Sequence, residues 1–322
     1  MYDSHEAARF IGAHSSFVVL GHREPDGDCV ASQITVATLL RAMGKRATLH
    51  SVGPFDRPEI AVFARRFSAT IDRAPLEGAA AIIVDCSTPD RTGSLGAELD
   101  GLPCLVIDHH SAGEPFGNAR FVDAAAPSTT MLILQLFEDL GFAADAETAR
   151  LLLFGLCTDT GFFRHLGRES GGTFRAVAGL VELGTSIADV YMMVFGKRAL
   201  SGRRLLAEML SRAESHWGDR LLLTWQTVED RERLLVTQRG EDDLYRLLQT
   251  IANNVVVALV KEEQPGAFTV GLRSDASLDV GAIAASFGGG GHRQASGFDI
   301  SGTLESVKKI LLDTFAPLLV GM

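Results

Sequence analysis

The chain has no apolar run long enough to cross a membrane as a helix. Such a helix needs about 20 consecutive apolar residues, and every apolar stretch in this sequence is much shorter. Residues 1–6 also lack the basic start and the apolar segment of a secretory signal peptide. From these two absences we expect a cytoplasmic protein that has no contact with a membrane.

Cysteine is scarce and has no regular spacing. The four cysteines, Cys29, Cys86, Cys104 and Cys157, include no C-x-x-C pair. This pattern fits reduced thiols in a cytosolic protein better than a disulfide framework. We expect each cysteine to be a small buried side chain.

The sequence also lacks a run of basic residues. Its 30 Lys and Arg are outnumbered by 40 Asp and Glu, which gives a net charge of −10, and aromatic residues are only 7%. A protein that holds long nucleic acid usually presents a broad basic face or a channel of stacking aromatic residues. We therefore expect no long nucleic acid as a partner, and any phosphate ligand should be small or held by metals and a few arginines.

Short apolar runs that alternate with helical patterns fill the first part of the chain. Up to about residue 183 this alternation predicts an α/β domain with a mostly parallel sheet and helices on both faces. Serine and threonine at 128–130 can cap a helix, and Gly44 and Gly141 can each end one. The expected helices are 31–43, 58–67, 128–140 and 146–157, with a short strand at 47–52.

The composition and the predicted elements change after about residue 196. Residues 196–216 are rich in Arg, Leu and Glu and predict one connecting helix. Strand-like runs at 221–227, 255–260 and 268–272 follow, with helical patterns at 242–251 and 280–287 between and after them. A chain of 322 residues has room for two domains, so we expect a second, smaller α+β domain joined by a helical linker.

Three apolar runs of the first domain, 17–20, 81–84 and 105–107, are each followed by acidic or histidine residues. Ligands bind beyond the carboxyl ends of the strands in open α/β sheets, so these residues should converge on one cleft. Imidazoles together with carboxylates suit Mn²⁺ or Mg²⁺ better than a structural zinc site. The residues are His22, Asp26 and Asp28 after the first run, Asp85 after the second, and Asp108, His109 and His110 after the third.

Asp159 is a further metal candidate because it lies at the end of an apolar helical pattern, before Gly161. A carboxylate at a helix C-terminus is unfavourable with the helix dipole, and a nearby metal ion would compensate. Aspartate is also common in turns without any ligand. Both interpretations stay open for this residue taken alone.

A glycine run near the C-terminus is the candidate substrate site. Residues 288–291 are four glycines, followed by His292 and Arg293, while Arg273 and Ser274 end an earlier strand-like run. Successive backbone N–H groups of such a run can point at an anion, and a following helix N-terminus would add its dipole. A flexible loop is the alternative, but the neighbouring basic residues favour a phosphate or nucleotide cradle.

These motifs together resemble a known family. The segments at His22–Asp28, at Asp85, at Asp108–His110 and at 158–161 resemble the four motifs of the DHH phosphoesterase superfamily. The segment 289–297, with Arg273 and Ser274 upstream, is similar to the DHH-associated C-terminal domain. The resemblance covers essentially the whole chain and is strongest to the nano-RNase and 3′-phosphoadenosine 5′-phosphate (PAP) phosphatase group. It implies a metal-binding domain at 1–185, a helical linker at 186–216 and a substrate-binding domain at 217–322.

The resemblance also implies a role for each candidate residue. One divalent ion, Mn²⁺ before Mg²⁺ or Co²⁺, would be held by His22 and Asp26, and a second by Asp28, His109 and Asp159. Asp85 would bridge the two ions, His110 would face the substrate phosphate, and Asp108 would orient His109. Substrate would be bound by Arg273, Ser274, Gly289, Gly290, Gly291 and His292. Many relatives carry a glutamate where this chain has Met131, so we expect the segment 128–131 to serve helix packing alone.

The activity implied is hydrolysis of short oligoribonucleotides to mononucleotides, of PAP to AMP, or of both, by a metal-activated water. A cyclic-di-AMP phosphodiesterase, a polyphosphatase or pyrophosphatase, and a nucleotide sensor without catalysis are the alternatives. The complete set of metal ligands argues against a sensor. The glycine-rich His292 segment argues against a pyrophosphatase, whose family members carry a basic Ser-Arg-Lys motif there. The order of preference among linear dinucleotides, cyclic dinucleotides and PAP, the base preference and the existence of a homodimer stay open.

Overall fold

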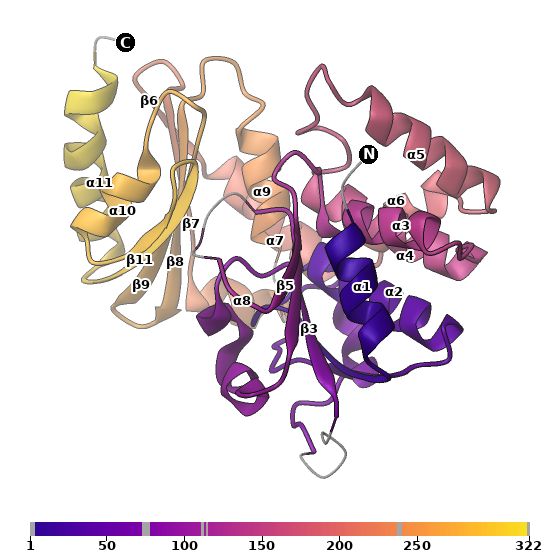
Figure 1. The fold of residues 1–322 in the computed structure, drawn as a ribbon. Helices are drawn as coiled ribbons and strands as arrows, with labels where there is room; N and C mark the ends of the chain where they lie inside the picture. The colour runs from indigo at the N-terminus through magenta and orange to yellow at the C-terminus, as the bar shows by residue number, and fades with distance from the viewer. Residues whose placement is uncertain (1–3, 73–77, 111–112, 114, 237–239, 321–322) are drawn as a thin grey trace. The chain divides into compact units, whose positions relative to one another are not determined.

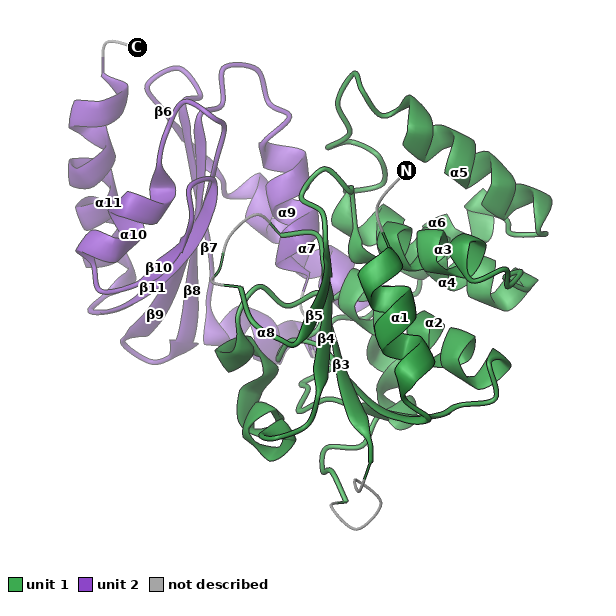
Figure 2. Ribbon diagram, viewed as in Figure 1, with its two compact units in different colours: residues 1–197 green, residues 198–322 purple. Residues whose placement is uncertain are grey.

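The structure is a computed structural model that describes residues 4–72, 78–110, 113, 115–236 and 240–320. The chain forms two compact units, residues 1–197 and 198–322 (Figures 1 and 2). Each unit has its own sheet and its own hydrophobic core. The expected α/β class with a second, smaller α+β domain is confirmed, while the boundaries expected at residues 185 and 216 stay a prediction.

Unit 1 is built on a five-stranded sheet in the order β2-β1-β3-β4-β5, with every strand parallel to its neighbours. The order reverses at β1 and β3, because β2 lies on one side of β1 and all later strands lie on the other. Ligands of doubly wound sheets bind outside the carboxyl ends of the strands at such a reversal. The strands are β1 (Ser16–Leu20), β2 (Arg46–His50), β3 (Ala80–Val84), β4 (Cys104–Asp108) and β5 (Ala119–Val122).

The helices of unit 1 gather on one face of this sheet (Figure 1). Alternate strand residues divide between the two faces: Phe17 and Val19 join the larger core with the helices, whereas Val18 and Leu20 join a smaller cluster. That smaller cluster is covered by the 3₁₀ helix η3 (Pro89–Leu99). We expected helices on both faces of the sheet, and the helix on this second face is of the 3₁₀ type. The helices are α1 (His5–Ala13), α2 (Gly27–Ala42), η1 (Ala61–Arg66), α3 (Thr129–Asp139), α4 (Ala146–Asp159), α5 (Gly171–Glu182) and α6 (Ile187–Phe195).

The predicted helix ends of unit 1 are confirmed where a local signal marked them. Gly44 and Gly141 follow α2 and α3 with φ of 76° and 72°, the left-handed region that glycine adopts without strain. Ser128 caps α3 by accepting a hydrogen bond from the Met131 N–H. The helix expected at 58–67 is instead turn followed by the short 3₁₀ helix η1.

Unit 2 has a mixed six-stranded sheet in the order β10-β11-β9-β8-β7-β6, in which only β7 and β8 are parallel. One face packs on α10 and α11, and part of the other packs on α7 and α9 (Figure 2). The strands are β6 (Glu214–His216), β7 (Leu221–Gln226), β8 (Val256–Gln264), β9 (Ala267–Ser274), β10 (Gly290–His292) and β11 (Ala295–Ser301). The helices are α7 (Leu200–Ser211), α8 (Val228–Leu234), α9 (Glu241–Leu248), α10 (Val280–Ser286) and α11 (Leu304–Leu319).

We expected one helix over residues 196–216. The structure instead has the helix α7 followed by the strand β6. Glu214–His216 pairs with β7 in an antiparallel ladder and forms the edge of the sheet. Residues 214–216 therefore leave the helical pattern because their backbones hydrogen-bond to β7.

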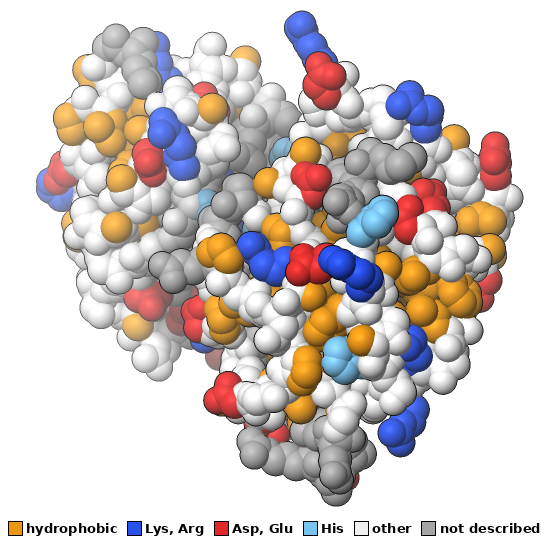
Figure 3. Space-filling model, in the orientation of Figure 1, with side chains coloured by type: hydrophobic (Ala, Val, Ile, Leu, Met, Phe, Trp, Pro, Cys, Tyr) orange, Lys and Arg blue, Asp and Glu red, His pale blue; other side chains and the backbone are white. Residues whose placement is uncertain are grey.

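Two further expectations concern a broad basic surface and a membrane-spanning helix. On the face shown in Figure 3, the described basic side chains lie singly among acidic and apolar ones and form no broad basic area. No single helix in the described ranges is long and apolar enough to span a membrane; the bent pair α5 and α6 reaches the threshold together by length and composition, with a bend of 105°.

Candidate metal centre

The predicted metal-binding residues of unit 1 come together at the carboxyl ends of β1, β3 and β4. Their side chains fall into overlapping groups in which the candidate ligand atoms all lie within 4.8 Å of one another. The groups are Asp85, His109 and His110; Asp28, His109 and Asp159; and His22, Cys29 and Asp85. Asp26 joins them through its Oδ1, which lies 3.9 Å from His22 Nε2. The site thus falls where the strand order reverses, as the topology rule requires.

Two histidines present a ring nitrogen to this cluster. The Nδ1 of His22 lies 2.8 Å from the Arg23 carbonyl oxygen, and the Nδ1 of His109 lies 3.3 Å from the Ala126 carbonyl oxygen. A carbonyl can only accept, so each ring carries a proton on Nδ1 and directs its Nε2 toward the carboxylates. Such an arrangement fixes the tautomer of metal-binding histidines.

The Nε2 of His109 is buried and has no hydrogen-bond partner among the described residues. It lies 3.6 Å from Asp85 Oδ1 and 3.4 Å from Asp159 Oδ2. A buried, unpaired polar atom is costly unless a ligand satisfies it. A cation between the nitrogen and these carboxylates would satisfy all three groups.

Asp85 follows the end of β3 in a strained conformation. Its φ is 55°, a left-handed value that is uncommon for residues other than glycine and that concentrates at functional sites. The backbone is held there because the Asp85 N–H donates a 2.9 Å hydrogen bond to the Ile107 carbonyl on β4. The carboxylate lies 3.6 Å from both His22 and His109, which is the central position within the cluster.

The N-terminus of α3 binds two of the carboxylates, which contradicts the expectation that residues 128–131 serve packing alone. The Thr129 N–H donates to Asp28 Oδ2 at 2.7 Å, and the Thr129 hydroxyl donates to Asp85 Oδ1 at 3.1 Å. Thr130 donates to Asp28 Oδ1 from its N–H at 3.1 Å and from its hydroxyl at 2.8 Å. Met131 does pack in the core. The helix dipole adds to these bonds.

The carboxylates of the cluster are crowded enough to disturb their titration. Burial raises the pKa of Asp28 well above its ordinary value, and repulsion by Asp85, Asp159 and Asp26 adds to this. Burial also raises the pKa of Asp159 to about 6, although attraction by His109 opposes the change. Gly155 on α4 makes this crowding possible, since a Cβ at this position would lie 2.8 Å from Asp28 Oδ1 and 2.4 Å from the Thr130 methyl. Divalent cations are the natural compensation for so many buried acids.

Asp108 holds the ring of His110, whereas we expected it to orient His109. Its Oδ1 accepts a 2.7 Å hydrogen bond from His110 Nδ1, and the backbone N–H groups of His109 and His110 donate to the same oxygen at 2.8 and 3.2 Å. His109 is therefore positioned by Asp108 through its backbone and by Ala126 through its ring. The hydrogen bond that His110 donates to Asp108 raises the pKa of His110, against the effect of burial.

Cys29 lies inside the cluster, although we expected only a small buried side chain there. Its thiol is grouped with His22 and Asp85, and burial raises the thiol pKa. A protonated thiol is a weak ligand, and a hard ion such as Mn²⁺ or Mg²⁺ prefers the oxygen of Asp26. The only available signal was its position directly after Asp28. All four cysteines are free and three are buried, as expected, whereas Cys104 is only partly buried.

The second half of the glycine run of unit 2 lies in a strand, and the helix N-terminus that we expected after the run is absent among the described residues. Gly290–His292 forms β10, which pairs antiparallel with β11. Gly289 and Gly291 are required by this contact, because a Cβ would lie 2.3 Å from the Gly297 oxygen at the former and 2.6 Å from the Ala295 oxygen at the latter. Gly290 has nothing within 4 Å of its Cβ position.

Strand register places the other predicted substrate residues on this sheet. Arg273 is opposite Ala295, and Ala295 is opposite His292, so the three form one row on one face. The next row on that face is Gly271, Gly297 and Gly290. These two rows, which we call the glycine shelf, expose backbone beside the Arg273 and His292 side chains. Ser274 points to the other face, where its buried hydroxyl donates to the Leu278 carbonyl, so its predicted role in substrate binding has no support in this geometry.

Removing the Thr129 hydroxyl is expected to weaken metal binding. Thr129→Val deletes the bond to Asp85 but keeps the N–H that holds Asp28, and loss of a group that orients a ligand typically costs about 10–100-fold in affinity. Calorimetric titration of metal-free protein with Mn²⁺ measures the change. Thr129→Ser keeps the hydroxyl and should bind like the wild type; equal affinity of the valine variant would show that the bond does not position Asp85.

Comparison with known proteins gives a consistent assignment. The model of the DHH family N-terminal domain matches residues 16–156, and the model of the DHHA1 domain matches residues 242–317. The bifunctional oligoribonuclease and PAP phosphatase NrnA of Thermus thermophilus is 30% identical over 285 residues, which cover 87% of this chain and 83% of that protein. NrnA of Mycoplasma genitalium is 24% identical over 298 residues, covering 91% of each chain.

Solved structures share the fold at lower identity. An exopolyphosphatase-related protein from Bacteroides fragilis superposes with a TM-score of 0.86 at 22% identity, over 97% of this chain and 96% of that one. The exonuclease RecJ bound to manganese superposes with a TM-score of 0.53 at 16% identity, over 97% and 94%. Both matched domains and the relative at 30% identity place the chain in one group of phosphoester hydrolases. The chain belongs to the DHH family of phosphoesterases, in the group that contains the NrnA oligoribonucleases and PAP phosphatases.

Proposed function

We propose that the chain hydrolyses short oligoribonucleotides, such as linear dinucleotides, to mononucleotides, and PAP to AMP at the same site, in a manganese-dependent reaction. The observation that carries the proposal is the buried, unpartnered Nε2 of His109 between the carboxylates of Asp85 and Asp159. The names of the NrnA relatives supply the substrate class, and manganese bound to RecJ supplies the ion.

The residues of the cluster suit two divalent ions. His22 and Asp26 would hold one ion, Asp28, His109 and Asp159 would hold the other, and Asp85 would contact both. Carboxylate oxygen and neutral imidazole are ligands for Mn²⁺, and both histidines already carry a proton on the opposite nitrogen. When bound, such ions polarise phosphoryl oxygens and provide a hydroxide nucleophile at neutral pH.

His110 is the proposed proton donor. Asp108 accepts from its Nδ1–H, so the pKa is raised and the ring tends to carry a second proton on Nε2. The oxygen of water adds to phosphorus while that water loses one proton to solvent, the bond from phosphorus to the leaving oxygen breaks, and His110 gives its Nε2 proton to that oxygen. Solvent then returns a proton to His110. A general acid of this kind typically contributes about 10²–10⁴-fold to the rate. The products are an alcohol on one fragment and a phosphate on the other, or AMP and inorganic phosphate from PAP.

The glycine shelf is the proposed site for a part of the substrate away from the reacting phosphate. Arg273 offers a guanidinium to a phosphate, and its Cζ lies 4.6 Å from the centroid of the Tyr245 ring. Position 271 has no room for a side chain, because a Cβ there would lie 2.1 Å from the Oη of Tyr245. Without side chains at Gly290 and Gly297, a flat base could approach the backbone closely while Arg273 and His292 bind its phosphate.

Arg273→Ala and His292→Ala are expected to raise KM for a 5′-phosphorylated dinucleotide. A charge-assisted hydrogen bond contributes roughly 1.5–3 kcal/mol, or about 10–100-fold in KM if it acts equally on substrate and transition state. Bound manganese should be unchanged, because both residues lie in unit 2 and all proposed ligands lie in unit 1. Lys309→Ala, which removes an exposed cation paired with Asp313 on α11, is the control. A wild-type KM in both shelf variants would remove the shelf from substrate binding.

One substrate panel tests the proposed function. Purified protein with Mn²⁺ is given a 5′-phosphorylated dinucleotide, a long RNA, PAP, cyclic di-AMP and polyphosphate, and products are separated by chromatography. We expect the highest kcat/KM on the dinucleotide, turnover of PAP, and a steep fall with RNA length. Preference for cyclic di-AMP or polyphosphate would replace the proposal with one of the alternatives, and turnover of none of the five would leave a nucleotide sensor.

A further inference from the structure

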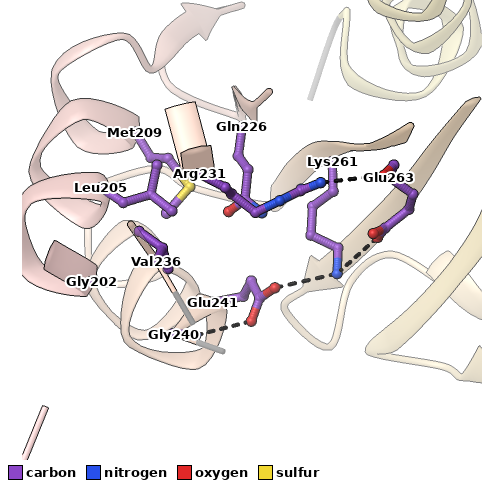
Figure 4. Close-up of a pocket in the computed structure, with 10 residues that line it drawn as sticks. All are labelled: Gly202, Leu205, Met209, Gln226, Arg231, Val236, Gly240, Glu241, Lys261 and Glu263. Atoms are coloured by element: carbon purple, nitrogen blue, oxygen red, sulfur yellow. Dashed lines mark hydrogen bonds and ion pairs between the residues drawn. The ribbon is translucent and has the colours of Figure 1, made fainter. Parts of the chain in front are cut away.

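Unit 2 contains a pocket that the proposed chemistry does not use (Figure 4). Its volume is about 270 Å³, and it lies where α7, α8 and the start of α9 meet the ends of β7 and β8. Lys261 in this pocket is four residues along β8 from Val257, which pairs with Arg273, a separation of about 13 Å along the strand. The pocket is therefore distinct from the glycine shelf.

The pocket has one apolar and one polar wall. In Figure 4, the side chains of Leu205 and Met209 on α7 form one side, and Lys261 and Glu263 from the end of β8 form the other. Arg231 extends across the space between them. A concave site with an apolar wall and a few convergent polar groups is the usual form of a small-molecule site.

The charged side chains of the polar wall neutralise one another. The Lys261 ammonium lies 3.2 Å from a carboxylate oxygen of Glu241 and 3.2 Å from one of Glu263. Burial acts to raise the pKa of Glu241, but Lys261 lowers it on balance, so the carboxylate is ionised. With Arg231 included, the charged side chains that line the described part of the pocket are two positive and two negative. A ligand that brings its own net charge would leave that charge unpaired, so an uncharged ligand is favoured.

Two planar groups of the pocket have hydrogen-bonding capacity left over. The Gln226 side chain is 6% exposed and points into the pocket, yet it makes no hydrogen bond within the described part of the chain. Arg231 makes a single long bond, from Nη2 to the Glu263 carbonyl at 3.4 Å. The amide atoms of Gln226 are not among the buried, unpartnered polar atoms of the described residues, so they face the open space of the pocket, where a ligand can bond them.

We propose that this pocket binds an uncharged purine, as adenine or adenosine. A glutamine amide donates and accepts in one plane and pairs with the N6 and N7 edge of adenine. A guanidinium stacks on the face of a base, and a methionine sulfur makes favourable contacts with aromatic rings. The volume of about 270 Å³ lies just below the range of roughly 300 to 1,000 Å³ that is usual for ligand pockets, so this pocket has room for a base or nucleoside and not for a dinucleotide.

Calorimetric titration with adenosine tests the proposal without relying on turnover. The full-length Arg273→Ala/His292→Ala variant is used in chelator, so that neither the glycine shelf nor bound metal contributes. We expect one site per chain, and Gln226→Leu in the same background should weaken binding roughly tenfold or more. Gln249→Leu removes the same side chain from the C-terminal end of α9, outside the pocket, and should have no effect. AMP, which adds charge, should bind more weakly than adenosine.

The proposal would be overturned by no binding of adenosine or adenine, by equal binding to Gln226→Leu, or by equal affinity for cytidine. Tighter binding of a free amino acid would also overturn it, since a zwitterion is the other ligand that a neutral pocket with paired charges could accept. Hydrolysis of the dinucleotide is measured separately, so failure of the proposed function does not change the outcome of this titration.

Discussion

Replacing Asp85 by asparagine is expected to remove most of kcat on a short RNA. Asp85 lies 3.6 Å from both His22 and His109, so it is the one carboxylate placed to contact both ions. Metal ions contribute several kcal/mol of transition-state stabilisation, and a loss of that size corresponds to about 10²–10³-fold or more. Asparagine keeps the shape of the side chain but removes the charge that the ions need.

Steady-state kinetics with excess Mn²⁺ measures this loss, and circular dichroism shows whether the fold is kept. Asp100→Asn makes the same chemical change at an exposed position after η3 and should leave kcat unaltered. Full activity of Asp85→Asn in metal-replete buffer would contradict the assignment of two ions to this cluster.

Replacement of His110 and of His109 by alanine is expected to have different effects on metal content. His110 is bonded to Asp108 through Nδ1 and has a raised pKa, so His110→Ala should keep its metal and lose about 10²–10⁴-fold in kcat. His109 presents a buried, unpartnered Nε2 to two carboxylates, so His109→Ala should lose metal as well as activity. Elemental analysis and kcat of the two variants decide between the roles.

His165→Ala is the matched control, because His165 is exposed and its ring contacts Arg164. The pH profile gives a second measure of the same assignment. Asp108→Asn removes the carboxylate that raises the His110 pKa, so the proton on Nε2 is lost at lower pH and the alkaline fall in kcat should move to lower pH. Equal metal loss from the two alanine variants would reverse the assignment of the histidines.

The strands and the convergence of site residues could be predicted because both follow local rules. The apolar runs before His22, Asp85 and Asp108 are buried strands, and parallel strands bring their carboxyl ends to one edge. The ends of α2 and α3 could also be predicted, because Gly44 and Gly141 adopt a left-handed conformation without strain. These features depend on a residue and its near neighbours in the sequence.

The features that could not be predicted depend on approach between distant elements. Thr129 meets Asp28 and Asp85 only because α3 begins beside the start of α2, and residue types alone do not reveal that contact. The preference of Asp108 for His110 over His109 is decided by side-chain direction in one short turn. Strand β10 forms because β11 offers a partner, whereas a glycine run by itself favours a loop.

The most direct test of the account is a titration of metal-free protein with Mn²⁺ while hydrolysis of a 5′-phosphorylated dinucleotide is followed. With the ligands divided between two ions that share Asp85, activity should be absent in chelator and should reach its maximum only after two equivalents of Mn²⁺ have bound per chain. Hydrolysis at full rate in chelator, or a maximum after a single equivalent, would contradict the two-ion centre.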